Sequence, residues 1–517
     1  MATPQEKFAI ALKELKALQD NNVSAIYTDE LSNRTTRELL LKNGFIKEVA
    51  KGWYISTSPA EKAGDTTSFY SSYWDFCARY LSRKFSKNWC LSPEQSVILH
   101  AGKWSVPTQL IVRSPTANNT LTSLSYNTSV FNLKAELPQK ELITEINGLQ
   151  LYSLVGSIIY SSASIFTLNP IETRTALSLI RDASQLLPIL IEKGHSTIAG
   201  RLVGAFINMG MGKIADQIME TMIAAGYDVR ETDPFDEQLD IKLSSRESSP
   251  FANRIKLLWR HMRTTIIEEF PPAPGLPENY DDYLKAIDEV YLTDAYHSLS
   301  IERYRVTPDL IERVSSGEWG EGENEVDKQQ RDAMAARGYY QCFQLVKESI
   351  KKILSGKNSG SVLDEDHQRW YRQLFDPSVT AGILKAGDLA GYRSHQVYIG
   401  GSKHMPFNVD AMRDTMPVFF ELLEQEPEAS VRAVLGHFIF VFIHPYMDGN
   451  GRIGRFIMNA MLASGGYPWT VIPVEQREAY MKALETASVS QDIGHFCKFL
   501  AELVNKNIEG KPVAHLP

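Results

Sequence analysis

The chain has 517 residues, of which 43% are hydrophobic and 22% are charged, and its formal net charge is −8. This length and composition predict several domains, each large enough to bury a core, in an ordinary soluble globular protein. The negative net charge excludes a general attraction to nucleic acid, so any such binding must be local.

Signals for membrane insertion or secretion are missing from the sequence. No apolar run reaches the roughly 18 residues that a membrane-spanning helix needs, and the first residues lack the basic-then-apolar pattern of a secretory signal. The four cysteines are scattered without a Cys-x-x-Cys pair, which argues against a zinc ribbon or a disulfide framework. We therefore expect a cytoplasmic protein with no membrane partner.

Residues 1–60 are predicted to form a winged helix-turn-helix. Apolar residues at helical spacing predict a helix over 5–19. Ser32 or Asn33 can cap a short second helix, which an Asn-Gly pair ends. Two short strands with a turn between them follow in 45–56. The order of helix, helix and hairpin is that of a winged helix.

The positive charge of this segment indicates a nucleic-acid partner. Residues 32–58 carry five basic and two acidic side chains, which form a local basic surface on an acidic chain. A small DNA-binding module needs such a surface to neutralise phosphates. The alternative is a winged helix that docks only onto another protein. The basic surface favours DNA.

Residues 61–230 are predicted to form a mixed α/β domain. Short strands are expected at 109–112 and 149–154, and the pattern is helical afterwards. A winged helix followed by Leu91-Ser92-Pro93-Glu94 and by such strands resembles the AbiEi-like antitoxin family over about 20–230. The resemblance rests on this arrangement, and it implies a DNA-binding or regulatory module rather than a second active site.

A linker and a connecting helix are expected over 231–284. The helix is predicted at 255–270, and four prolines between 271 and 277 interrupt any regular structure and mark a boundary. From about 281 the pattern is mostly helical, with one predicted hairpin at 391–401. The predicted helices cover 281–298, 308–314, 328–355, 364–375, 409–424, 430–443, 452–464, 475–487 and 492–506. The expected fold class is therefore mainly α, with a mixed α/β part in the first half.

One polar, glycine-rich stretch lies between two apolar runs of this second half. It reads His-Pro-Tyr-Met-Asp-Gly-Asn-Gly-Arg-Ile-Gly-Arg from His444 to Arg455. The proline after His444 turns the chain out of helical geometry. An imidazole with an unperturbed pKa near 6.5 can deprotonate a hydroxyl at neutral pH. The sequence predicts a general base at this point.

The residues that follow the histidine are suited to phosphate. Asp448 can hold Mg²⁺ next to phosphate oxygens. The segment 449–451 can direct successive N–H groups toward one anion, at the start of a helix expected near Arg452. Arg452 and Arg455 are three residues apart and share a helix face. In the alternative, His444 is a core histidine, the aspartate a helix cap and the arginines a solvated face.

Taken together, His444 to Arg455 resembles the Fic signature, H-P-F-x-(D/E)-G-N-G-R-x-x-R, with Tyr446 in place of the usual Phe. The resemblance covers about 285–505 and implies an all-helical Fic domain with a β-hairpin flap. Fic proteins mostly transfer AMP from ATP to a Ser, Thr or Tyr hydroxyl of a target protein. The resemblance thus implies a protein adenylyltransferase that uses ATP as donor and Mg²⁺ as cofactor.

The same resemblance implies roles for individual residues. His444 is the general base, Asp448 is the Mg²⁺ ligand, Gly449, Asn450, Gly451 and Arg452 form the phosphate cradle, and Arg455 grips the γ-phosphate. Fic relatives that use ATP as a phosphate donor tend to carry Lys at the position of Gly451, which favours nucleotidyl transfer here. His437, seven residues before His444, has no such neighbours in the sequence and is expected in the core.

Two further segments resemble parts of Fic proteins. Val397-Tyr398-Ile399-Gly400-Gly401 resembles the flap, a hairpin that holds the target's backbone as an added strand. The resemblance places Val397 and Gly400 at the nucleotide site. The alternative is a plain surface hairpin.

The second segment, Ser298-Leu299-Ser300-Ile301-Glu302, resembles the inhibitory motif (S/T)-x-x-x-E-(G/N). The resemblance implies that Glu302 pairs with Arg455 and occupies the space of the γ-phosphate. Arg303 stands where the family has Gly or Asn, which puts the local helix ending in question. The alternative for this segment is an ordinary helix face.

Two other functions remain open. One is a DNA-binding transcriptional regulator or antitoxin whose Fic domain senses nucleotides. The other is a Fic enzyme with a different donor, such as UTP, GTP or CDP-choline. The partners expected are ATP, a protein with an accessible hydroxyl, and DNA through the winged helix, while a homo-oligomer is neither required nor excluded by the sequence.

Overall fold

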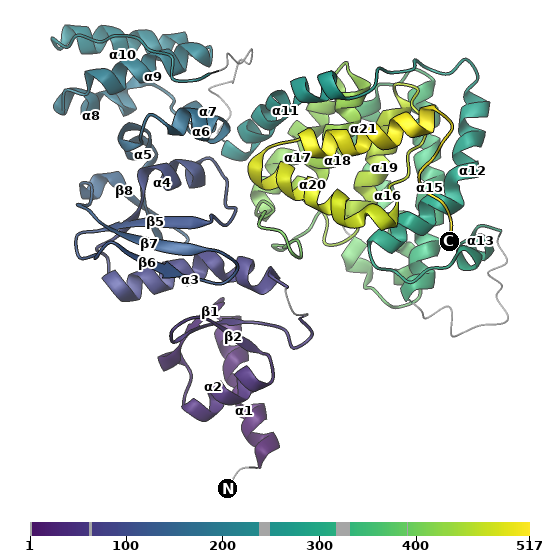
Figure 1. The fold of residues 1–517 in the computed structure, drawn as a ribbon, viewed down its shortest axis with the longest axis horizontal. Helices are drawn as coiled ribbons and strands as arrows, with labels where there is room; N and C mark the ends of the chain where they lie inside the picture. Colours follow the sequence, from purple (N-terminus) through teal and green to yellow (C-terminus); the bar gives the residue numbers. More distant parts are fainter. Residues whose placement is uncertain (1–2, 62–64, 237–248, 317–330, 390) are drawn as a thin grey trace. The chain divides into compact units, whose positions relative to one another are not determined.

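The structure is a computed structural model that describes residues 3–61, 65–236, 249–316, 331–389 and 391–517. The contacts between residues divide the chain into two compact units. The first unit contains Met1–Arg254 and Tyr398–Met405, and the second contains Ile255–Val397 and Pro406–Pro517. Helices predominate, and every strand found in the described residues belongs to the first unit (Figure 1). Within those residues, no helix combines the length and apolar character needed to cross a membrane.

The N-terminal elements of the first unit follow the predicted order. They are α1 (Pro4–Asp20), β1 (Ala25–Tyr27), α2 (Arg34–Lys42), β2 (Ile46–Ala50) and β3 (Trp53–Ser56). The three strands form an antiparallel sheet in the order β1-β3-β2. Asn33 rather than Ser32 caps α2, because its side-chain oxygen accepts the Thr36 N–H at 2.9 Å.

The rest of the first unit contains two more sheets and a group of helices. The four-stranded sheet has the order β4-β5-β7-β6, with β5 and β7 parallel, and β8 pairs with β9. The strands are β4 (Cys90–Leu91), β5 (Gln109–Ser114), β6 (Thr120–Ser123), β7 (Ser129–Lys134), β8 (Ile143–Ile146) and β9 (Leu149–Tyr152). The helices are α3 (Thr67–Phe85), α4 (Pro93–His100), α5 (Leu154–Tyr160), α6 (Ile165–Leu168), α7 (Pro170–Ser178), α8 (Leu187–Glu192), α9 (Ser196–Asn208) and α10 (Gly212–Ala224). Both strands predicted from the sequence are present.

The division between the units falls inside helix α11 (Pro250–Glu269), which is the predicted connecting helix. The proline-rich segment 271–277, expected at a domain boundary, lies instead within the second unit. The hydroxyl of Tyr467 donates to the carbonyl of Pro271 at 2.6 Å, and the Gly275 N–H donates to the carbonyl of Gly465 at 3.1 Å. The prolines interrupt regular structure as predicted, but these contacts hold the segment against its own unit.

The second unit is helical. Its helices are α12 (Tyr280–Ile301), α13 (Pro308–Ser315), α15 (Arg331–Leu354), α16 (Ser359–Thr380), α17 (Val409–Gln425), α18 (Ala429–Ile443), α19 (Asn450–Ala463), α20 (Arg477–Ser490) and α21 (Gly494–Ile508). Each helix predicted from residue 281 onward is present, and α16 extends beyond its predicted ends. The predicted start of one helix at 328 lies outside the described residues.

The hairpin predicted at 391–401 is wrong, since the described residues of this stretch contain no strand. Side chains, rather than a β-ladder, satisfy the carbonyl groups there. The amide of Gln396 donates to the carbonyl of Pro406 at 2.8 Å, and the guanidinium of Arg393 donates to the carbonyl of Phe407. Proline has no N–H and cannot complete a ladder at this position.

Helices α18 and α19 lie on either side of the loop at 444–449 and are almost wholly buried. Leu435 and Phe438 on α18, and Ile453 and Ile457 on α19, have 0% exposed surface. A helix that is apolar all round belongs to a core, and each large apolar side chain contributes roughly 1.5–3 kcal/mol when buried. The loop between the two helices is therefore fixed at both ends.

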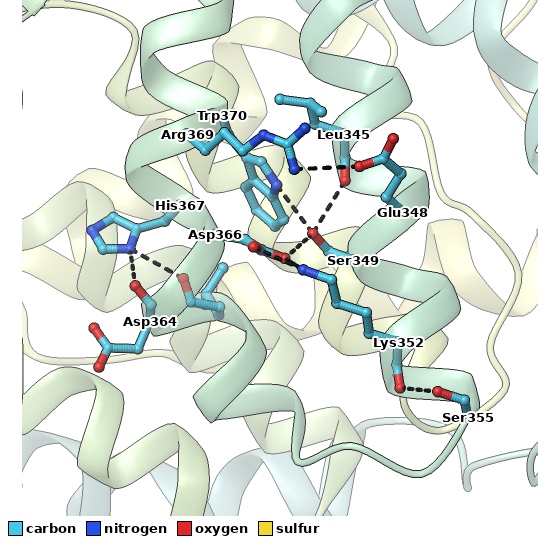
Figure 2. Close-up of polar contacts among 11 residues, drawn as sticks. Leu345, Glu348, Ser349, Lys352, Ser355, Asp364, Asp366, His367, Arg369 and Trp370 are labelled. Carbon is cyan, nitrogen blue, oxygen red and sulfur yellow. Dashed lines mark hydrogen bonds and ion pairs between the residues drawn. The ribbon is translucent and has the colours of Figure 1, made fainter.

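A polar cluster joins α15 to α16, which in turn packs against α19 (Figure 2). The carboxylate of Asp366 accepts the Ser349 hydroxyl at 2.6 Å and the Lys352 ammonium at 2.7 and 2.9 Å. The indole N–H of Trp370 donates to the Ser349 hydroxyl at 3.2 Å. Asp366 is the shared acceptor of the cluster.

Replacing Asp366 by asparagine is expected to destabilise the second unit. The amide nitrogen cannot accept from Lys352, and the loss of a hydrogen-bonded charge costs about 2 kcal/mol. For a unit of this size, the melting midpoint should fall by about 4–8 °C, measured by circular dichroism. Glu365→Gln, an exposed change on the same helix, is the control. An equal fall in both variants would contradict a structural role for Asp366.

Candidate active site

His444 ends helix α18 in the left-handed conformation, with φ 57° and ψ 61°. Residues other than glycine and asparagine rarely adopt it. Its ring Nδ1 lies 3.1 Å from the carbonyl oxygen of Val441. Because a carbonyl can only accept, Nδ1 carries the proton, and the lone pair of Nε2 remains available. The imidazole is held in the tautomer that a general base requires.

The surroundings of His444 keep its ring neutral. Burial lowers the pKa of His444 to about 4, and the nearby Arg393 guanidinium acts in the same direction. The hydrogen bond to Val441 and the carboxylates of Glu302 and Asp448 oppose this shift in pKa. At pH 7 the imidazole is therefore unprotonated and can accept a proton.

The loop after His444 is closed by Asn450. The Tyr446 N–H donates to the Asn450 side-chain oxygen at 2.9 Å, and the Asn450 amide donates to the Tyr446 carbonyl at 2.8 Å. The Tyr446 ring stacks on that of Tyr371 with centroids 3.8 Å apart and planes 3° apart. Tyrosine in place of the usual phenylalanine thus keeps the anchoring role of the ring. The Asn450 side chain is used inside the loop, so only its backbone can contact a phosphate.

Helix α19 begins at Asn450, two residues before the predicted start at 452. Gly449 precedes it with φ 80°, a conformation that glycine adopts without strain. The first hydrogen bond across this helix start runs from the Ile453 N–H to the Gly449 carbonyl at 3.0 Å. The preceding N–H groups, at 450–452, have no partner within the helix and are available to an anion.

Arg452 is buried, with 1% of its surface exposed, between two aromatic rings. Its guanidinium carbon lies 4.9 Å from the ring centroid of Phe375 and 5.0 Å from that of Tyr304. Within the described residues, its Nε and Nη2 have no hydrogen-bond partner. Burying an N–H donor costs free energy unless a ligand accepts its hydrogen bond. These two guanidinium atoms indicate an anion site beside the start of α19.

Asp448 lies next to this anion site and is exposed. Its Oδ1 is 3.7 Å from Nη2 of Arg452 and accepts the Gly449 N–H at 2.6 Å. The described residues contain no group of three metal-ligating side chains. Asp448 therefore fits a magnesium ion that takes its other ligands from phosphate and water.

Arg455 is buried against helix α12, on which the predicted inhibitory motif lies. Its Nε donates to the Ser298 hydroxyl at 2.8 Å, and its Nη2 donates to the Ser298 carbonyl at 3.0 Å. The same Nη2 donates to Oε1 of Glu302 at 2.8 Å. Nη1 of Arg455 forms no hydrogen bond within the described residues. The structure thus brings Ser298, Glu302 and Arg455 together.

The Glu302 carboxylate occupies the space directly over Gly451. A side chain on Gly451 would meet Oε1 of Glu302, because an added Cβ would overlap that oxygen. Burial by itself would raise the pKa of the Glu302 carboxyl, but Arg455 and Arg452 outweigh it and the pKa is lowered. The carboxylate is thus a charged group held in the anion site.

Arg303 ends helix α12 in the left-handed conformation, with φ 67°. Its N–H donates to the Ser300 carbonyl at 2.9 Å, and the next N–H, of Tyr304, donates to the Leu299 carbonyl at 3.1 Å. This hydrogen-bond pattern is the Schellman motif, in which glycine or asparagine is usual. Arg303 thus takes the backbone geometry of the residue it replaces, and the helix still ends at Glu302.

Val397 and Gly400 belong to different units of the chain. Val397 belongs to the second unit, and its carbonyl accepts the Gln396 amide at 3.2 Å. Gly400 belongs to the first unit, where Thr67 is the side chain nearest to its Cβ position. Tyr304, whose ring faces the Arg452 guanidinium, is a site residue that the sequence did not predict. A lone aromatic residue gives no sequence signal of a contact with an arginine far along the chain.

Acid is expected to destabilise the second unit through its buried neutral histidines. His437, predicted in the core, and His367 are each 0% exposed. Burial lowers the pKa of His367 to about 4 and that of His437 to about 3. Unfolded histidines take up protons near pH 6.5. Below that pH the unfolded state therefore binds more protons, and the stability present above pH 6.5 is lost as the pH falls toward 4.

Each of these histidines should contribute a slope of about 1.4 kcal/mol per pH unit in this window. His367→Gln should remove one such contribution between pH 6.5 and 4.5, measured by urea unfolding. His495→Gln is the control, because that ring is 70% exposed. If the unfolding free energy of His367→Gln has the same slope against pH as that of the unchanged protein, His367 is not the buried neutral group proposed here.

Residues 363–462 match the model of the Fic/DOC family. The chain is 37% identical to protein adenylyltransferase Fic of Drosophila willistoni over 122 residues, which is 23% of this chain and 24% of that protein. It is 37% identical to the protein of that name in Drosophila mojavensis over 266 residues, or 50% of this chain and 48% of the other.

These matches span between about a quarter and about half of the relatives' length. Among solved structures, Fic-1 from C. elegans covers 66% of this chain and 97% of its own, with a TM-score of 0.37 and 16% identity. The family match includes the whole stretch from His444 to Arg455.

Proposed function

We propose that this chain is a protein adenylyltransferase that transfers AMP from ATP to a hydroxyl side chain of a target protein. The observation that carries the proposal is a set of buried guanidinium atoms on α19, namely Nε and Nη2 of Arg452 and Nη1 of Arg455, that form no hydrogen bond within the described residues. Together with the N–H groups at the start of α19, they provide directed donors for a polyphosphate, directly after a loop that begins with a neutral histidine. The names of the Drosophila relatives support the same activity.

In the proposed reaction, Nε2 of His444 takes the proton from the target hydroxyl as its oxygen attacks the α-phosphorus. The bond from that phosphorus to the bridging oxygen breaks, AMP stays on the target, and pyrophosphate leaves. The N–H groups at 450–452 and Arg452 would hold the phosphates and stabilise the charge that develops on them. Asp448 would hold Mg²⁺, which supplies positive charge beside the phosphate oxygens. Val397 and Gly400 keep their predicted place near the nucleotide as part of this proposal.

We further propose that Glu302 inhibits this reaction. Its carboxylate pairs with Arg455 over Gly451, where a third phosphate would need the same guanidinium. An anion already held by Arg455 repels a polyphosphate and takes its donor. ATP would then bind in a pose unsuited to transfer until α12 releases the carboxylate.

The donor and the group transferred are tested with labelled nucleotides. The protein and a hydroxyl-bearing acceptor protein are incubated with ATP labelled at the α- or at the γ-phosphate, and separately with α-labelled UTP and GTP and labelled CDP-choline. Label from α-ATP is expected on protein, and label from γ-ATP is not. Incorporation of γ-label, or of another donor in place of ATP, would overturn the assignment.

A second function, DNA binding, is favoured by the N-terminal elements. The sheet order β1-β3-β2 with α2 before the β2–β3 turn is compatible with a winged helix. On α2 and its flanks, Lys42 and Lys51 are exposed basic side chains. Arg34, however, pairs with Glu38, which balances its charge, and Lys47 donates to the Tyr126 hydroxyl. A gel shift with the promoter of its own gene tests this function, and loss of any shift above low salt would argue against a specific site.

A further inference from the structure

Arg393 is a buried cation whose contacts the sequence does not reveal. It is 1% exposed, and within the described residues it forms no ion pair with a carboxylate. Burial lowers the pKa of Arg393 to about 10, so the group remains charged at pH 7. A charge is buried at a cost unless strong hydrogen bonds compensate it. The contacts of this guanidinium therefore require an explanation.

All the hydrogen bonds of the Arg393 side chain go to backbone carbonyls of three separate segments. Its Nε donates to the carbonyl of His444 at 2.8 Å, its Nη1 to that of His395 at 3.1 Å, and its Nη2 to that of Phe407. Its own backbone N–H donates to the carbonyl of Pro445 at 2.8 Å. One residue thus binds two successive carbonyls of the loop and both ends of the segment 395–407.

These contacts act on the geometry of His444. Residue 444 has a left-handed backbone, which for a non-glycine residue persists only where the surroundings impose it. A hydrogen bond to its carbonyl fixes the peptide plane that follows the imidazole. Since Val441 fixes the ring from the other side, the direction of Nε2 depends on both partners.

Arg393 also links His444 to two other places in the second unit, at His395 and at Phe407. The guanidinium bridges the carbonyls of these two residues. A planar guanidinium with five donors in fixed directions can make three such contacts at once, which a lysine ammonium cannot. The arrangement ties the backbone at His395 to that at Phe407 and to the loop.

We propose that Arg393 is a positioning residue that sets the orientation of His444 and holds the backbone at His395 and Phe407 in register with it. This inference rests on the proposed function, since it assigns His444 the role of base. Arg393 acts through the carbonyls that it binds.

The test compares Arg393→Met, which keeps an unbranched apolar stem and removes every side-chain donor, with Arg393→Lys, which keeps the charge. Both substitutions are combined with Glu302→Gly, so that transfer is measured without inhibition by the Glu302 carboxylate. In Arg393→Met we expect kcat to fall on the order of 10²-fold, as for a reacting group displaced by about 1 Å, with KM for ATP nearly unchanged. Arg393→Lys should lose less, and Arg413→Met, an exposed change on α17, should lose nothing.

Two readouts separate positioning from a merely structural role. Loss of the cation should move the acidic limb of the pH–rate profile to higher pH in Arg393→Met but not in Arg393→Lys. The carboxylates of Glu302 and Asp448 also act on His444, so the comparison is made with Glu302→Gly present in all proteins. Equal losses in both variants with an unmoved acidic limb, or a kcat within about twofold of the parent in Arg393→Met, would overturn the proposal. If Arg393→Met does not fold, an unchanged kcat in Arg393→Lys overturns it.

The titration of His444 can be measured without any transfer reaction, so it tests the role of Arg393 independently of the proposed function. Histidine labelled with ¹³C at Cε1 reports the titration of His444 by NMR, with His444→Ala used to assign the signal. If the parent transfers no label from any donor, the proposed function fails. The His444 signal must still titrate at higher pH in Arg393→Met than in the parent, and an identical titration refutes the role of Arg393.

Discussion

Glu302→Gly is expected to raise AMP transfer, both to the protein itself and to an acceptor, on the order of tenfold or more. The carboxylate now holds Nη2 of Arg455 at 2.8 Å and occupies the space over Gly451. A contact that favours the inhibited state by 1.4 kcal/mol reduces the competent fraction tenfold. Glu302 is the C-cap of α12 rather than an interior residue, so glycine there does not break the helix. Incorporation of α-labelled ATP measures the effect.

Two further variants identify the cause of the expected increase. Glu302→Gln keeps the volume and removes the charge, and it should give an intermediate rate if charge and space both contribute. Glu289→Gln, an exposed change on the same helix, should leave transfer unchanged. Incorporation by Glu302→Gly equal to that of the unchanged protein would refute the inhibitory role.

The loop and its helices could be predicted from the sequence because their signals are local. The apolar runs of α18 and α19 require burial, and the proline after His444 ends the first helix as predicted. Gly449 has the positive φ that its residue type favours. Helix α19 begins two residues before its predicted start, at Asn450, whose side chain closes the loop against Tyr446.

The parts that could not be predicted depend on contacts between distant residues. Arg393 lies 51 residues before His444 and reads in the sequence as an ordinary loop arginine. The hairpin expected from the glycines near 400 is absent, because side chains of Arg393 and Gln396 take the carbonyls that a ladder would use. The pairing of Glu302 with Arg455 came from the family resemblance. Its position over Gly451 depends on how α12 packs, which the sequence does not encode locally.

His444→Ala is expected to abolish transfer, with a rate loss of about 10²–10⁴-fold, while ATP still binds. The loss follows from removing the only positioned base of the loop, since general-base catalysis contributes factors of this size. Binding is retained because the phosphate donors, the N–H groups at 450–452 and Arg452, belong to α19 and do not include the imidazole. Alanine also keeps the C-cap position filled, although a left-handed φ costs it roughly 1–2 kcal/mol. Rates are measured with α-labelled ATP, and binding by calorimetry.

The pH dependence of the transfer rate is a second, independent test of His444 as the base. With the pKa of His444 lowered to about 4, the base is already neutral at pH 5 and above. The transfer rate of Glu302→Gly should therefore stay level from about pH 5.5 to 8 and fall only in more acidic solution, unlike that of an enzyme with an unperturbed histidine near 6.5. His495→Ala, at an exposed ring, should keep both the rate and the level profile. Transfer that survives in His444→Ala would refute the base assignment, and a fall in rate centred near pH 6.5 would show that the imidazole is solvated rather than buried.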